Sequence, residues 1–188
     1  MNRMGYGRRG PSSFNKLDSA LAFREMGLKN GDAFADLGCG AGDYSLYACS
    51  ITGAEGKVYA VDISEDMISG LREEIRRRNL CNIIAVESDI CNSIRLSDDS
   101  VDCCLLATVM HAAKLMGNDK NLFPEIMRIL RPGGCLAIIE CKKEETFFGP
   151  PLSMRISPEE LDGAVSPYGF KKKKCVDLGY YYMMLFSY

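Results

Sequence analysis

The chain has 188 residues, of which 47% are hydrophobic and 26% are charged, and its formal net charge is -2. This length allows one domain with its own hydrophobic core, and the composition is that of a soluble globular protein rather than a disordered or membrane one. The near-neutral charge and the lack of an apolar run of roughly 20 residues predict one cytoplasmic domain, residues 1–188, with no nucleic-acid partner and no membrane span.

Residues 1–15 are rich in glycine and arginine and show neither a helical nor a strand-like period. They lack the apolar stretch of a secretory signal, which agrees with a reducing cytoplasmic environment for the nine cysteines. We expect residues 1–15 to form a flexible N-terminal segment. Two interpretations of it stay open: a mobile lid over a binding cleft, or a frayed terminus without a role.

Short apolar runs predict the first three strands at residues 33–37, 57–62 and 82–87. Helical patterns separate these strands. One helix is expected at residues 44–50, and another begins after Ser64, which suits a helix N-cap. Alternation of strands and helices indicates a parallel sheet with helices on its faces.

The second half of the chain extends this pattern and then departs from it. We expect a strand, a helix and a further strand at residues 101–107, 122–130 and 135–140, followed by a short helix at residues 157–166. Two last strands, 170–176 and 181–187, are separated by only four residues. Because so short a link cannot hold a parallel crossover, these two strands are predicted to form an antiparallel hairpin.

A glycine-rich motif lies where the first strand turns into the first helix. Gly38, Gly40 and Gly42 allow a sharp turn and let a ligand lie against the backbone. The dinucleotide fingerprint requires a further glycine where this chain has Asp43. Carboxylates at positions 36 and 43 would repel a pyrophosphate, whereas Asp36 suits the ammonium group of a methionine moiety. A tight turn without a ligand is the alternative.

Two further carboxylates follow the next two strands. Asp62 ends the second strand, where it could accept hydrogen bonds from both ribose hydroxyls at the carboxyl edge of the sheet. Asp89 follows the third strand and could accept from an adenine amino group, with Ile63 and Ile90 as apolar walls for the ring. Each aspartate alone is more often an ordinary loop residue. Their joint placement after successive strands favours a ligand site.

These motifs resemble those of the class I S-adenosylmethionine-dependent methyltransferases, in particular the small-molecule branch that includes the quinone-biosynthesis enzymes. The resemblance is carried by residues 35–42, 58–64, 88–90, 101–102 and 125–134. It implies an α/β Rossmann-like, seven-stranded, mostly parallel sheet with helices on both faces and a C-terminal antiparallel hairpin. It also implies S-adenosyl-L-methionine as cofactor, with the three glycines lining methionine and ribose, Asp62 on the ribose and Asp89 on the adenine.

Two polar residues are candidates for chemistry with the acceptor. Displacement at a sulfonium needs a general base only if the acceptor arrives protonated. His111, the sole histidine, follows the fourth strand, and Glu140 ends the fifth, so both are expected near the cleft. Each is either a polar residue of the acceptor pocket or a packed structural residue, and both interpretations stay open. The cysteines lack a CxxC pair, so we expect no metal site.

We therefore predict in-line methyl transfer to a small-molecule acceptor. The alternatives are a methyltransferase acting on a protein or RNA and a non-catalytic, cofactor-binding partner subunit. Enzymes that methylate amino groups of nucleobases or glutamine carry a motif after the fourth strand: Asn or Asp, then Pro-Pro, then an aromatic residue. This chain has Ala-Thr-Val-Met at residues 107–110, which argues against those acceptors. The four lysines at 171–174 are interpreted as a solvated strand edge. The acceptor atom and the oligomeric state stay open, a homodimer included.

Overall fold

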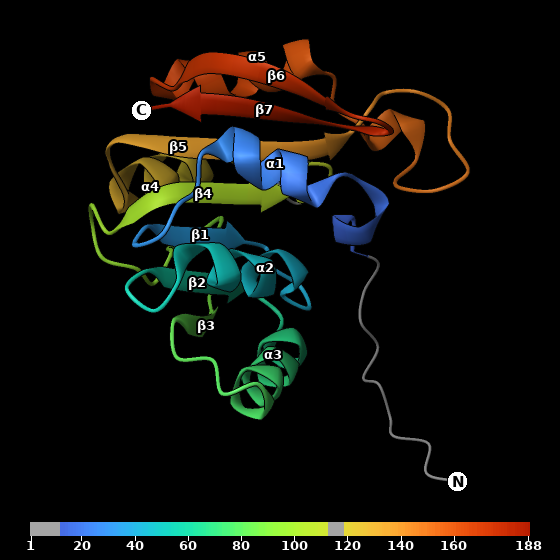
Figure 1. Cartoon of the computed structure of the whole chain (residues 1–188). Helices are drawn as coiled ribbons and strands as arrows, with labels where there is room; N and C mark the ends of the chain where they lie inside the picture. The colour runs from blue at the N-terminus through green and yellow to red at the C-terminus, as the bar shows by residue number, and fades with distance from the viewer. Residues whose placement is uncertain (1–11, 113–118) are drawn as a thin grey trace, which may run out of the picture.

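A seven-stranded sheet in the order β3-β2-β1-β4-β5-β7-β6 runs through the computed structural model, which describes residues 12–112 and 119–188 (Figure 1). The five parallel strands are β1 (Ala33–Leu37), β2 (Lys57–Asp62), β3 (Ile83–Glu87), β4 (Val101–Ala107) and β5 (Leu130–Cys141). The strands β6 (Lys171–Leu178) and β7 (Tyr181–Ser187) form an antiparallel hairpin, and β7 pairs antiparallel with β5. The predicted fold class is confirmed.

Helices cover both faces of the sheet. One face carries α1 (Ser19–Met26), α2 (Asp43–Thr52) and α3 (Glu65–Arg77), and the other carries α4 (Asp119–Ile129) and α5 (Pro158–Val165) (Figure 1). Successive strand residues point to opposite faces, so Phe34 packs in the core under α1–α3 and Ala35 in the core under α4 and α5. The 3₁₀ turns are η1 (Phe14–Lys16), η2 (Leu152–Met154) and η3 (Ser166–Tyr168).

Local sequence signals set the helix ends. Asp18 caps α1 by accepting from Leu21 N at 2.8 Å, and Ser64 caps α3 by accepting from Met67 N at 3.4 Å. A reciprocal capping box between Ser157 and Glu160 begins α5. These side chains satisfy backbone donors that have no partner within a helix.

The strand order places a crevice at the carboxyl end of β1. The chain passes from β1 to β2 and β3 on one side, and from β3 across to β4 and β5 on the other, so β1 lies between β2 and β4. In open α/β sheets ligands bind where the strand order reverses in this way. The loops that follow β1, β2, β3 and β4 all meet at this edge of the sheet (Figure 1).

The N-terminal segment is described from residue 12 onward, so the predicted lid or frayed terminus over residues 1–11 lies outside the described residues. The remainder of that segment packs against α2. Ser13 is buried and its Oγ lies 3.0 Å from Tyr44 Oη, and the rings of Phe14 and Tyr44 meet edge to face at 5.1 Å. Ser12 and Ser13 lie at the edge of the crevice.

The C-terminal hairpin shows two details. Lysines 171–174 are exposed on the edge strand β6, as predicted. Tyr181 and Tyr182 are buried in β7, whereas Tyr180 lies at the hairpin turn and is 58% exposed. In the part of the chain that the structure describes, no helix is long and apolar enough to span a bilayer.

Candidate active site

The glycine motif forms a left-handed loop between β1 and α2. Gly38 and Gly40 have φ of 79° and 52°, which favour glycine. A Cβ on Gly38 would lie 2.7 Å from Val109 Cγ2, so this glycine is needed for close packing. A Cβ on Gly40 would meet nothing within 4 Å. The backbone at Gly40 is therefore open to a ligand.

Asp62 joins the end of β2 to this loop. Its Oδ2 accepts from Gly40 N at 2.8 Å, and its Oδ1 accepts from Ser64 N at 2.9 Å. These two bonds orient the carboxylate. Each oxygen can still accept a further hydrogen bond, because it has a second lone pair. Asp62 is half-buried, so hydroxyl groups of a ligand can reach it.

A cavity of about 360 Å³ lies beyond Asp62 and includes Ile63, Asp89 and Ile90 in its lining. Ile63 is 64% exposed and Ile90 is buried, so one wall is open to solvent and the other is part of the core. Asp89 Oδ1 accepts from Cys91 N at 3.0 Å. The structure thus brings together the residues that the sequence analysis expected around an aromatic ring.

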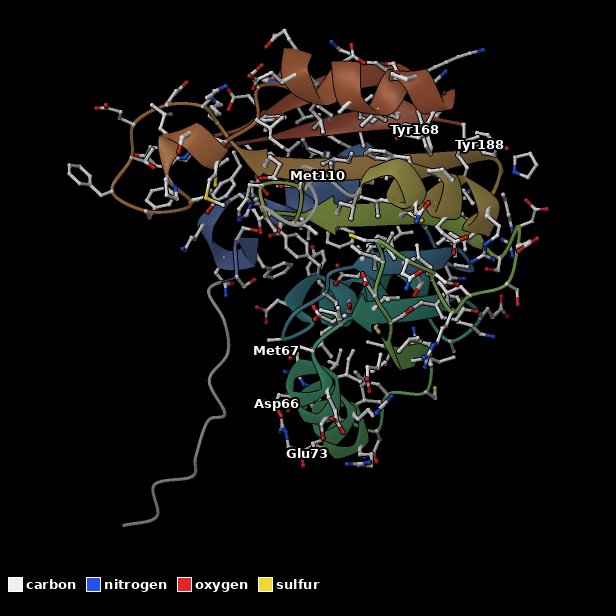
Figure 2. All side chains as sticks on the ribbon, turned by 180° about the vertical axis from the view of Figure 1, so that it is seen from behind. Asp66, Met67, Glu73, Met110, Tyr168 and Tyr188 are labelled. Atoms are coloured by element: carbon white, nitrogen blue, oxygen red, sulfur yellow. The ribbon has the colours of Figure 1, made fainter. Side chains whose placement is uncertain are left out.

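A second cavity, of about 160 Å³, lies on the other side of the glycine loop and includes Asp36, Gly40, Tyr44 and Met67. Figure 2 labels Met67 at the start of α3. Gly38 and Thr108 line both cavities. The two cavities are therefore adjacent at the carboxyl edge of β1 and β4, on either side of Gly38 and Thr108.

Asp36 is a buried carboxyl at the second cavity. It is 1% exposed, and it accepts a hydrogen bond from Ser45 Oγ at 2.6 Å. Burial raises the pKa of Asp36 to about 7, the bond from Ser45 opposes this, and the charges of Asp62 and Asp43 add to the increase. In residues 12–112 and 119–188 no basic side chain is paired with Asp36. A ligand cation would supply the missing partner.

Glu140 and His111 form a pair behind the end of β4. Glu140 is 1% exposed; its Oε1 accepts from Met110 N at 2.8 Å, and its Oε2 lies 3.0 Å from His111 Nδ1. Both residues are expected near the cleft, but neither lines the two cavities, and the Glu140 carboxylate is instead bonded to Met110 N and His111 Nδ1. Figure 2 labels Met110 in this segment. The charge of Glu140 also acts on Tyr182. Together with burial, which is the larger cause, it raises the pKa of the Tyr182 hydroxyl well above its usual range.

The carboxylate of Glu140 sets the state of the imidazole. A carboxylate oxygen accepts, so His111 donates through Nδ1 in this pair, and the neutral tautomer that does so has its lone pair on Nε2. Within the described ranges no residue forms a hydrogen bond with Nε2. The pair can therefore accept a proton at Nε2 and stabilise the resulting charge through Glu140.

Sequence reasoning missed several residues of the site. Ser45 could have been found from its position in the first turn after the glycine loop. Ser13 and Thr108 carried no signal, because one comes from a distant segment and the other depends on its backbone conformation. Among residues 12–112 and 119–188, no group of three His, Cys, Asp or Glu side chains could hold a metal ion.

Comparison with known proteins agrees with this geometry. The sequence profile of the family described as "Methyltransferase domain" matches residues 28–176. Among solved structures, an S-adenosylmethionine-dependent methyltransferase from Aquifex aeolicus is similar at a TM-score of 0.85 and 31% identity, covering 95% of this chain and 94% of that chain.

Curated relatives match over a shorter part of their own length. Arsenite methyltransferase of Halobacterium salinarum is 29% identical over 136 residues, 72% of this chain and 33% of that protein. Demethylmenaquinone methyltransferase of Geobacillus stearothermophilus is 25% identical over 149 residues, 72% of this chain and 61% of that protein. This chain thus spans less than two thirds of either relative. Because the family profile covers most of its length, the chain belongs to the methyltransferase domain family as a class I S-adenosylmethionine-dependent methyltransferase.

Proposed function

We propose that this enzyme transfers the methyl group of S-adenosylmethionine to a small organic acceptor by in-line displacement. The observation that carries the proposal is the pair of adjacent cavities, each lined by at least one carboxylate, with Thr108 and Gly38 lining both. The relatives named for arsenite and demethylmenaquinone support a small acceptor, since both names refer to small molecules.

The residues of the cleft fit the cofactor. We place the adenine between Ile63 and Ile90 with its amino group toward Asp89, the ribose hydroxyls on Asp62, and the ammonium group on Asp36. Asp36 is the strongest part of this fit, because this buried carboxyl, which has no basic partner among residues 12–112 and 119–188, gains most from a cation. Glycine at position 40 leaves the backbone bare where the ligand passes.

The protein's part in the reaction is positioning and proton removal. The bound cofactor supplies the methyl group on a sulfonium, which is a good leaving group. Holding the acceptor in line and excluding water provides most of the acceleration. His111 then takes the proton of the acceptor at Nε2 while Glu140 orients the ring. We therefore propose an acceptor that must lose a proton, such as a hydroxyl group or an activated C–H.

An arsenite acceptor is less well supported by this site. A trivalent arsenic atom is bound by thiolates, but Cys39 and Cys91 line different cavities. Cys103 lies in β4 and Cys135 in β5 at paired positions, four residues or more before the carboxyl edge of the sheet. The cysteines therefore do not converge where the methyl group would be transferred.

The acceptor class is tested by supplying methyl-labelled cofactor together with separated fractions of a cell extract: small molecules, protein and RNA. We expect the label to enter the small-molecule fraction, and mass spectrometry then identifies the product. The Asp62→Ala variant serves as the control with impaired cofactor binding. Label confined to protein or RNA would contradict the proposal, and so would the absence of transfer to any fraction by protein that binds the cofactor.

A further inference from the structure

A left-handed threonine lies at the carboxyl end of β4. Thr108 has φ of 56°, and the other non-glycine residues with positive φ in the described ranges are Asn79 and Asp99. Asparagine and aspartate adopt this conformation more readily than other residues, whereas a β-branched residue is an outlier there. Such strain persists only where the surrounding structure holds it, and it concentrates at functional sites.

Hydrogen bonds and packing hold Thr108 in this conformation. Its N donates to Ile139 O at 2.7 Å, next to the last β4–β5 pair, and its Oγ1 donates to Ala107 O at 2.7 Å. Immediately after the turn, Val109 packs against the bare Cα of Gly38. The strained residue thus lies between the end of the sheet and the glycine loop.

The same turn leads the chain to Glu140. Met110 N and His111 Nδ1 both bind the Glu140 carboxylate, at 2.8 and 3.0 Å. A residue with an extended backbone at position 108 would continue the direction of β4 and carry these two groups away from Glu140. Both contacts are made where the chain has turned away from the direction of β4.

We infer that Thr108 is a positioning residue, whose left-handed turn directs Val109 onto the glycine loop and His111 onto Glu140. The glycine loop, which would bind the cofactor, and the His111 imidazole, which would accept the proton, are then held at fixed positions relative to each other. This inference rests on the proposed function for its purpose, but the geometry that it describes can be measured without an acceptor.

The test compares Thr108→Gly with Thr108→Asn. Glycine accepts positive φ but does not enforce it, whereas asparagine favours it. His111 is the only histidine, so ¹⁵N-histidine labelling reports one imidazole and gives the ratio of its two neutral tautomers. In Thr108→Gly we expect that ratio to move at least threefold toward the ratio of free histidine, and the amide of Met110 to exchange at least tenfold faster. Thr108→Asn should keep both signals near the wild type.

The matched control is Asn79→Gly, which makes the same backbone change at a left-handed residue after α3 and should leave the His111 signals unchanged. Thermal unfolding should show Thr108→Gly folded, with a midpoint no lower than that of the wild type. The inference would be overturned if Thr108→Gly kept the His111 tautomer ratio and the Met110 amide exchange rate of the wild type. An equal change in Thr108→Asn, or a change in Asn79→Gly, would overturn it as well. None of these readouts depends on methyl transfer, so failure of the proposed function would be seen separately.

Discussion

At the scale of single residues, three carboxylates at one sheet edge have different surroundings. Asp36 is buried with a hydroxyl as its partner, Asp62 holds two backbone donors, and Asp89 holds one. The sequence indicated which residues would meet there. It could not indicate how they differ, because the burial of each carboxylate depends on the packing of the whole fold, and one donor to Asp62, the amide of Gly40, lies 22 residues away.

The Asp62→Ala substitution should weaken binding of S-adenosylhomocysteine, the demethylated cofactor, at least tenfold. The carboxylate would make two charge-assisted hydrogen bonds to ribose, each worth about 1.5–3 kcal/mol, and it also orders the Gly40 amide. Isothermal titration calorimetry measures the affinity, with circular dichroism to check the fold. Asp66→Ala removes the same charge from an exposed position on α3 and should bind normally. Unchanged affinity in Asp62→Ala would remove this residue from the site.

Cofactor affinity should fall as the pH is lowered from 7.5 to 6. Since the pKa of Asp36 is raised to about 7, the carboxyl becomes protonated in this range and loses its attraction for an ammonium group. Adenosine, which lacks that group, should show no such loss. Calorimetry with both ligands across this pH range checks the expectation. If the affinities of both ligands changed with pH in the same way, Asp36 would not face the ammonium group.

The Asp36→Asn substitution should stabilise the free protein at pH 8 while weakening cofactor binding. Because the folded pKa is raised from 3.8 to about 7, the folded state binds the proton more tightly, and the stability due to this group is lost as the pH rises through 7. The free energy of unfolding at pH 8 should increase on the order of 1–4 kcal/mol, and the difference should vanish near pH 4. Urea unfolding at both pH values measures this, and a destabilised variant at pH 8 would contradict it.

At the scale of elements, the strands were predictable and one helix was not. Short apolar runs located β1 to β4 within a residue, because buried parallel strands are continuously hydrophobic. The helix α1 was not recognised, although Asp18 and Gly27 mark its ends. It is only eight residues long. The left-handed exit from β4 had no local signal, since threonine does not favour it.

The turn η1 should owe part of its stability to the contact between Ser13 Oγ and Tyr44 Oη, 3.0 Å apart in the core. A double-mutant cycle of Ser13→Ala and Tyr44→Phe should give a coupling of about 1 kcal/mol, because a buried hydrogen bond contributes that much. Urea unfolding of the four proteins measures it. Additive effects would show that η1 and α2 are not coupled through this bond.

At the scale of the whole molecule, alternation of strands and helices followed by a close pair of strands was enough to predict the architecture. The strand order reverses at β1, so the ends of β1 and β2, with Asp36 and Asp62, converge at one edge with the loops that carry Asp89 and Thr108. Their convergence follows from topology, which the order of elements encodes. The pairing of Glu140 with His111 and Met110 follows from side-chain packing, which that order does not encode.

The account depends most directly on what the cleft binds. Calorimetric titration of the wild-type protein with S-adenosylhomocysteine and with a nicotinamide dinucleotide tests this in one experiment. We predict saturable one-to-one binding of S-adenosylhomocysteine and no measurable binding of the dinucleotide, because carboxylates at positions 36 and 43 repel a pyrophosphate and Asp36 attracts an ammonium group. Tighter binding of the dinucleotide would contradict the assignment of the cleft.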